Sequence, residues 1–154
     1  MNLKQEVTIL IVDDDPGHAR LIEKNLRRAA LANPIERFSD GQEVLDFLFC
    51  KTERQRPAEA AYLLLLDIRM PKVDGVEVLR QIKEDTELRK IPVIMLTTTD
   101  DPREVSRCHA LGCSHYLVKP VDYEKFSETI ASLGHFVTMV EVPEVNVQPS
   151  PSGA

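Results

Sequence analysis

Short apolar runs that end in polar residues are the feature that most restricts how this sequence can fold. Val7–Val12 (VTILIV) is too short for a helix and is followed directly by three acids. Tyr62–Leu66 (YLLLL) and Ile91–Leu96 (IPVIML) also end directly before a polar residue. Runs of this kind are typical of strands that are buried on both faces of a sheet. Ile35–Phe38 and Ser114–Val118 complete a set of five predicted strands.

Amphipathic stretches separate the predicted strands. Four of them begin at an aspartate that can cap a helix, namely Asp15, Asp40, Asp101 and Asp122. Proline follows Asp15 and Asp101, and proline favours the first helical position. Strands that alternate with helices of this length predict an α/β fold. We expect a doubly wound, five-stranded parallel sheet with right-handed crossovers and helices on both faces.

Polar side chains follow the predicted strand ends, where ligands bind in open α/β sheets. They are Asp13, Asp14, Asp15, Asp67, Thr97 and Lys119. Carboxylates that lie close together repel one another unless a cation joins them, and Mg²⁺ prefers oxygen ligands. A carboxylate-held metal beside a lysine and a hydroxyl is typical of phosphoryl transfer. The strand ends therefore predict a magnesium-dependent phosphoryl-transfer site.

Four ordered motifs carry a family resemblance. They are VDDD at 12–15, LLLDIRMPKVDG at 64–75, IPVIMLTT at 91–98 and YLVKP at 116–120. Together they resemble the receiver domain of two-component response regulators, the phosphoacceptor partners of histidine kinases, in its CheY-like single-domain form. The resemblance extends from about Val7 to Leu133. It implies a flavodoxin-like (βα)5 receiver fold with strand order 2-1-3-4-5, over residues 1–135.

The resemblance assigns the acidic residues by position. Asp67 would be the phosphoacceptor. Asp14, Asp67 and the backbone carbonyl of Arg69 would bind Mg²⁺ directly, and Asp13 would act through water. The protein would then be a phosphoacceptor for signalling rather than an enzyme that acts on a separate substrate.

The resemblance also implies a switch. Lys119 would pair with the phosphoryl oxygens, and its bond to Pro120 would be cis. Thr97 would move toward the phosphoryl group and Tyr116 would turn inward. This movement would change the surface of the fourth helix, the fifth strand and the fifth helix, which would signal to a protein partner or support dimerisation.

Residues 136–154 would form a C-terminal extension. It is apolar to about residue 142, and the rest is expected to be disordered because it is rich in proline and serine. The apolar part could pack on its own domain or on a second copy beside the switch surface. With the loop at 51–59, this tail resembles receivers that pair with phytochrome-type histidine kinases and commonly dimerise.

Charge and composition exclude other classes of function. Acids outnumber bases by 25 to 19, so the net charge of −6 argues against nucleic-acid binding. No apolar run reaches the length of about 18 residues that a membrane span needs. Met1–Glu6 is polar, which argues against a signal peptide. Three cysteines, an odd number, indicate reduced thiols, so we expect a cytoplasmic protein.

Two alternative functions remain. Asp13-x-Asp15, Thr97 and Lys119 match motifs of haloacid-dehalogenase-type phosphatases, in which Asp13 would be the nucleophile. That interpretation gives Asp67 no role and lacks the paired acids expected after Lys119. The other alternative is a pseudo-receiver that acts as an interaction module without phosphorylation. Such modules usually lack one of the site residues, and this sequence keeps all of them.

The remaining histidines and cysteines receive structural interpretations. Cys108 and Cys113 lie near His109 and His115, but their spacing fits no usual zinc pattern. We expect both thiols to pack as small hydrophobic groups. His18 lies near the acidic strand ends and is expected to be a solvated residue of the first helix, with a gating role near the phosphorylation site as the alternative.

Overall fold

The computed structural model describes residues 6–29, 31–51, 57, 59–120, 122–139 and 141–146. Five parallel strands form its main sheet in the order β2-β1-β3-β4-β5, which confirms the expected topology. The elements in chain order are β1 Val7–Val12, α1 Pro16–Arg28, β2 Ile35–Phe38, α2 Gly41–Leu48, β3 Glu59–Leu66, α3 Gly75–Glu84, the 3-10 helix η1 Leu88–Lys90, β4 Val93–Thr97, α4 Pro102–Leu111, β5 His115–Val118, α5 Tyr123–Val137 and β6 Val145–Asn146.

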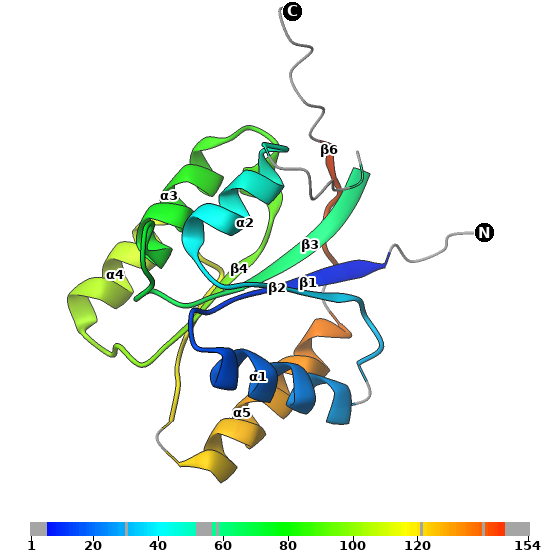
Figure 1. Ribbon diagram of the computed structural model, residues 1–154, viewed down its shortest axis with the longest axis vertical. Helices are drawn as coiled ribbons and strands as arrows, with labels where there is room; N and C mark the ends of the chain where they lie inside the picture. Colours follow the sequence, from blue (N-terminus) through cyan, green and yellow to red (C-terminus); the bar gives the residue numbers. More distant parts are fainter. Residues whose placement is uncertain are drawn as a thin grey trace, which may run out of the picture.

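Helices cover both faces of the sheet, with α1 and α5 on one face and α2, α3 and α4 on the other (Figure 1). Successive side chains of a strand point to opposite faces. Leu63 and Leu65 of β3 therefore pack in the core under α1 and α5, whereas Leu64 and Leu66 pack in the other core. Because both faces are covered, the central strands β1, β3 and β4 are mostly apolar.

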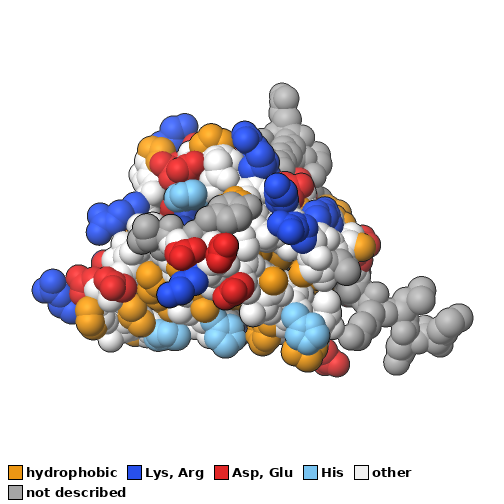
Figure 2. Space-filling model, turned by 90° about the horizontal axis from the view of Figure 1, so that it is seen from below, with side chains coloured by type: hydrophobic (Ala, Val, Ile, Leu, Met, Phe, Trp, Pro, Cys, Tyr) orange, Lys and Arg blue, Asp and Glu red, His pale blue; other side chains and the backbone are white. Residues whose placement is uncertain are grey.

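The outer surface of α1 and α5 is charged (Figure 2). Exposed basic residues lie on α1, and exposed acids lie at the start of α5 beside Lys125. The inner sides of the same helices are apolar, as Ile22 of α1 and Ile130 of α5 illustrate. This division of each helix into a charged side and an apolar side is what the amphipathic pattern predicts. None of the helices in the described ranges is both long and apolar enough to cross a membrane.

Helix caps lie where the sequence predicts them. The Asp15 side chain accepts hydrogen bonds from Gly17 N and His18 N, and Asp40 accepts one from Glu43 N. The caps at Asp101 and Asp122 are also confirmed. Each cap satisfies backbone N–H groups that have no partner within the first turn. The caps therefore fix where each chain segment turns away from the sheet.

Strand β4 begins two residues later than predicted. Ile91 N donates to Leu88 O at 2.9 Å, which closes the turn of η1 and keeps Ile91 out of the strand. Pro92 has no N–H to donate to a neighbouring strand. At the other end, Thr97 belongs to β4 because it pairs with Val118 of β5. The position of Thr97 is therefore fixed by the pairing of β4 with β5.

The C-terminal segment departs from the expected extension. Helix α5 continues to Val137, past the boundary predicted at residue 135. The expectation of disorder after about residue 142 is wrong for Val145 and Asn146, which pair antiparallel with the start of β3. Val145 is fully buried in the core under α2 and α3, and this burial stabilises the short strand. Residues 147–154 and most of the 51–59 loop lie outside the described residues.

Candidate phosphoryl-transfer site

Three carboxylates meet at the carboxyl ends of β1 and β3. These strands are neighbours, with Val12 opposite Leu66, so the residues that follow them meet at one edge. Asp67 N donates to Val12 O at 3.0 Å, which ties the two strand ends together. Oxygen atoms of Asp13, Asp14 and Asp67 lie within 4.8 Å of one another. The structure therefore brings together the three acids that the sequence singles out.

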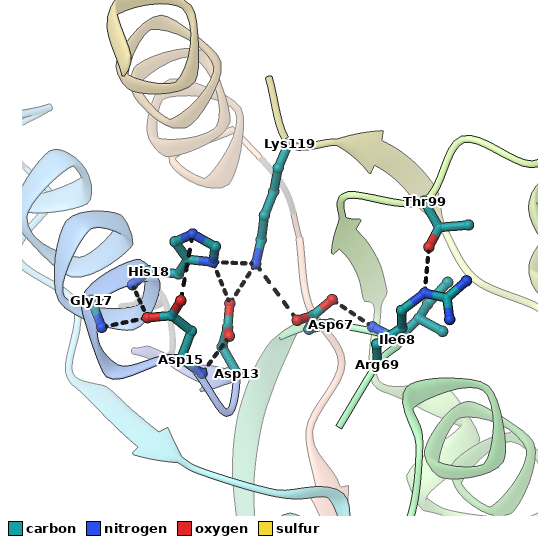
Figure 3. Close-up of polar contacts among 9 residues, drawn as sticks. All are labelled: Asp13, Asp15, Gly17, His18, Asp67, Ile68, Arg69, Thr99 and Lys119. Atoms are coloured by element: carbon teal, nitrogen blue, oxygen red, sulfur yellow. Dashed lines mark hydrogen bonds and ion pairs between the residues drawn. The ribbon is translucent and has the colours of Figure 1, made fainter. Parts of the chain in front are cut away.

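Lys119 reaches this acidic group from the end of β5 (Figure 3). Its Nζ atom lies 2.6 Å from Asp13 Oδ2 and 3.6 Å from Asp67 Oδ2. Lys119 N donates to Thr97 O at 2.7 Å, which fixes the start of the side chain. Burial raises the pKa of Asp13, and the hydrogen bond and charge of Lys119 oppose that rise. The ammonium thus compensates a carboxylate that is otherwise costly to ionise in this environment.

Asp67 remains partly accessible, with 12% of its side chain exposed. Its Oδ1 atom accepts a hydrogen bond from Ile68 N at 2.8 Å. Gly75 supports the backbone behind it, because a Cβ at this position would lie 2.0 Å from Asp67 O. Gly75 N also donates to Ile68 O at 2.7 Å. The carboxylate is therefore held in a fixed orientation with one oxygen facing Lys119.

The hydroxyl groups of Thr97 and Tyr116 differ in their hydrogen bonding. Thr97 is fully buried, and its hydroxyl has no hydrogen-bond partner in the described part of the chain. The Tyr116 hydroxyl donates to Thr99 O at 2.7 Å, and its ring packs, partly buried, against the core under α2, α3 and α4. Burial raises the pKa of Tyr116 to about 12. The buried Thr97 hydroxyl is thus available for a new acceptor.

Arg69 and Asp14 line the open side of the site. A groove of about 560 Å³ beside the carboxylates is bordered by both residues. The Arg69 side chain turns away from the acids, and its Nε atom donates to Thr99 Oγ1 at 3.1 Å. The Arg69 guanidinium is therefore engaged by Thr99 and does not act as the counter-charge of Asp14. The carboxylate oxygens of Asp13, Asp14 and Asp67 fit a hard divalent cation such as Mg²⁺.

The sequence places His18 near the acidic strand ends but does not identify its contact with Lys119. Its Nδ1 atom lies 3.2 Å from Lys119 Nζ and 4.0 Å from Asp13 Oδ2. The expectation of a solvated residue is incomplete, since 43% of the side chain is exposed and the remainder faces the site. The position of His18 in the sequence indicates its place near the site, because it lies three residues after the Asp15 cap, on the helical turn nearest the strand ends.

One sequence expectation about the backbone is wrong. The peptide bond between Lys119 and Pro120 is trans, since no bond between described residues is cis. The preference for trans before proline is only about 0.5–1 kcal/mol, so local packing decides the isomer. Here the trans chain already allows Lys119 N to bond Thr97 O and Nζ to bond Asp13.

The cysteines behave as the sequence predicts. Cys50, Cys108 and Cys113 are free thiols, and the last two are buried. Cys113 Sγ lies 3.7 Å from His109 Nδ1, but no group of three or more metal-binding side chains among the described residues includes either cysteine. The packing of Cys108 and Cys113 in the core under α2, α3 and α4 confirms that these thiols act as small hydrophobic groups.

Known proteins similar to this chain cover most of its length. Residues 9–131 match the family model described as response regulator receiver domain. Response regulator Rcp1 of Synechocystis sp. is 30% identical over 128 residues, which cover 83% of this chain and 86% of that protein. The crystal structure of its Mn²⁺-bound form has a TM-score of 0.81 and covers 88% of this chain and 98% of that chain.

Two further crystal structures are similar. A response regulator receiver domain from Rhodospirillum rubrum has 45% identity and a TM-score of 0.85, covering 91% of this chain and 99% of that chain. The phosphorylated cyanobacterial phytochrome response regulator RcpA has 27% identity and a TM-score of 0.81, covering 90% of this chain and 99% of that chain.

Proposed function

The chain belongs to the response regulator receiver domain family, and from that membership we propose that Asp67 accepts a phosphoryl group from a sensor histidine kinase. The observation that carries this assignment is the position of Lys119 Nζ, 3.6 Å from an oxygen of Asp67, within a group of three carboxylates. Similarity to Rcp1 and to the phytochrome response regulator RcpA supports a kinase of the phytochrome type.

The transfer would proceed by direct displacement at phosphorus. The carboxylate oxygen of Asp67 that faces Lys119 would attack the phosphorus of a phosphohistidine. A new O–P bond would form while the P–N bond breaks, and the imidazole would leave with the electron pair. Lys119 would offer its ammonium to the negative charge on the transferred group, which is how positioned cations assist phosphoryl transfer.

The acidic residues would bind a divalent cation, which we propose to be Mg²⁺. Asp14, Asp67 and the carbonyl oxygen of Arg69 would hold it directly, and Asp13 would act through water. Both Asp14 and Arg69 border the open groove beside the carboxylates, and all the donors are oxygens. When bound, the ion would neutralise charge on the phosphoryl oxygens.

The output would pass through the surface of α4, β5 and α5. The buried Thr97 hydroxyl would bond a phosphoryl oxygen, and the inward position of Tyr116 would be stabilised at the same time. Exposed apolar groups lie on this surface, since Val118 of β5 is 41% exposed and Leu117, Leu133 and Phe136 line a groove between β5 and α5. We propose that a second copy or a protein partner covers it.

Intact-mass measurement tests the assignment of the acceptor. Wild-type protein incubated with Mg²⁺ and acetyl phosphate should gain the mass of one phosphoryl group, and Asp67→Ala should gain none. Asp46→Ala, which removes a carboxylate on the outer side of α2, should behave like wild type. No gain in wild-type protein would support the pseudo-receiver alternative. Gain in Asp67→Ala would move the acceptor to another acid.

The phosphatase alternative finds no support in the geometry. Asp13 would be its nucleophile, yet Asp13 is 4% exposed and one of its oxygens is bonded to Lys119. A nucleophile must reach phosphorus in line, and the more accessible Asp67 is better placed for that.

Size-exclusion chromatography with light scattering tests the output. The phosphorylated wild-type sample should contain more dimer than the untreated one if a second copy covers the α4–β5–α5 surface. An unchanged mass would favour a different protein partner.

A further inference from the structure

Among the contacts described above for the Lys119 ammonium, the imidazole of His18 is the only side chain that is not a carboxylate. Lys119 Nζ lies 2.6 Å from Asp13 Oδ2, 3.2 Å from His18 Nδ1 and 3.6 Å from Asp67 Oδ2. An ammonium carries three N–H groups and accepts no hydrogen bond. Among the described residues, Asp13 and His18 lie within hydrogen-bond distance of it, and Asp67 lies just beyond that distance as an ion-pair partner (Figure 3).

The direction of this hydrogen bond fixes the tautomer of His18. Because Lys119 can only donate, His18 Nδ1 must accept, and the ring proton must be on Nε2. Nε2 lies 3.7 Å from Asp15 Oδ2, on the side of the ring away from Lys119. The Asp15 carboxylate is held by the cap of α1. The proton on Nε2 therefore faces a fixed carboxylate, which favours this tautomer.

Packing also restrains the ring. The centroids of His18 and Phe126 are 6.4 Å apart, with the ring planes inclined at 35°. Phe126 is a buried residue of α5, so the ring rests on the core and not on a mobile side chain. Restraint on both edges and one face keeps Nδ1 directed at Lys119 Nζ.

We propose that His18 is a positioning residue, which holds the Lys119 ammonium between Asp13 and the phosphoacceptor. Without this acceptor, Asp13 would be the only described residue within hydrogen-bond distance of the ammonium, and that contact is already the shortest at 2.6 Å. Lys119 would then be withdrawn from Asp67, and phosphoryl transfer would slow. This inference rests on the proposed function of Asp67.

Two substitutions separate the hydrogen bond from the ring. His18→Asn places an amide oxygen near the position of Nδ1 and removes the aromatic ring. His18→Phe keeps a ring on Phe126 and removes the acceptor. Because one hydrogen bond to a charged group is comparable with the 1.4 kcal/mol of a tenfold rate change, we expect His18→Phe to be phosphorylated about tenfold more slowly. His18→Asn should remain within about twofold of wild type.

The rate is measured by intact mass during incubation with acetyl phosphate and Mg²⁺, with circular dichroism to verify folding. His135→Phe is the matched control, because His135 is an exposed histidine at the far end of α5. Equal rates in His18→Phe and wild type would overturn the proposal. So would a slow His18→Asn beside a normal His18→Phe, since that pattern would mean that the ring acts through packing.

A second readout does not depend on phosphorylation. The ammonium protons of Lys119 should give a slowly exchanging nitrogen-15 NMR signal in wild type and in His18→Asn, and the signal should shift or disappear in His18→Phe. An unchanged signal in His18→Phe would contradict the hydrogen bond. Absence of any mass gain in wild type would overturn the role of Asp67, whereas normal wild-type phosphorylation with equal rates in all variants would overturn only the role of His18.

Discussion

Lys119 Nζ is 2.6 Å from Asp13 Oδ2, and at most 3% of either side chain is exposed to solvent. For an ion pair this deeply buried, the stability that the pair contributes differs from the stability that is lost when one partner is removed. Both charges have lost their hydration, so the pair contributes little net stability as a whole, but removal of one partner leaves the other charge buried and uncompensated. The pair therefore makes the phosphoryl-transfer site a determinant of stability as well as of chemistry.

Replacement of Lys119 should destabilise the fold at neutral pH. In Lys119→Met the Asp13 carboxylate loses its counter-charge, and we expect the free energy of unfolding to fall by about 3 kcal/mol. The measurement is urea denaturation followed by circular dichroism. Lys125→Met removes an exposed lysine from α5 and should change stability by less than about 0.5 kcal/mol.

Mg²⁺ provides the complementary check on that variant. A cation among the three carboxylates would replace the missing charge, so addition of Mg²⁺ should recover part of the stability lost in Lys119→Met. Equal stability of the Lys119→Met and Lys125→Met proteins would contradict the buried pair as described.

A side chain at position 75 should disturb the acceptor. The Cβ of Gly75→Ala would lie 2.0 Å from Asp67 O, and backbone atoms must move to relieve that contact. We expect a loss of about 1–3 kcal/mol of stability, the usual range for overpacking, together with slower phosphorylation. Gly17→Ala is the control, because its Cβ would meet a side-chain oxygen of Asp15 at 3.1 Å and no backbone atom. Similar losses in both variants would show that the close approach at Gly75 is not the cause.

Tyr116 should titrate at unusually high pH. Burial raises its pKa from the ordinary value of 10.0 to about 12. A folded-state pKa above the unfolded value means that the hydroxyl's contribution to stability is complete below pH 10 and is lost as pH rises toward 12. The difference between the alkaline absorbance titrations of wild type and Tyr116→Phe isolates this group. A difference curve centred at the ordinary value would contradict its buried hydrogen bond to Thr99.

The three thiols should differ in reactivity. Burial raises the pKa of Cys108 to about 11 and also raises that of Cys113, whereas Cys50 is only half-buried. The thiolate is the reactive form, so an aromatic disulfide reagent should modify Cys50 first in the native protein and all three cysteines in urea. Rapid modification of Cys108 in the native protein would indicate an opening of α4. Cys50→Ser, which should remove the fast phase, is the control.

The short strand β6 should contribute to stability through Val145. Val145→Ala removes the equivalent of two buried methylene groups, so we expect the free energy of unfolding to fall by about 1.5 kcal/mol. Met139→Ala is the control, because Met139 is 64% exposed and its loss should be within about 0.5 kcal/mol of zero. Thermal denaturation of both variants measures the difference. Equal effects would mean that β6 does not pack as described.

The strand order and the gathering of the acids follow from the sequence because parallel strands bring their carboxyl ends to one edge. Asp13, Asp67 and Lys119 each come directly after a strand, so their convergence needs no knowledge of side-chain packing. His18 is different. Its place beside Lys119 depends on where a long side chain from the end of β5 reaches, and helical spacing carries no such information.

Two other features of the structure also cannot be predicted from the local sequence. The bond before Pro120 is trans, and the intrinsic preference between the isomers is too small for local sequence to fix the choice. Val145 and Asn146 are ordered by pairing with β3, far away in the sequence. A composition rich in proline around them indicates disorder only if no such partner exists.

The pairing of β6 has a practical consequence for work in living cells. β6 lies against the first residues of β3, whereas Asp67 follows the last one. The eight residues of β3 span about 26 Å at the usual rise per residue. The described chain also begins at that same edge, at Glu6 just before β1. A fluorescent reporter joined at Glu6 or Asn146, the first and last described residues, would therefore be attached at the edge away from Asp67, leaving the proposed acceptor open for imaging of active protein.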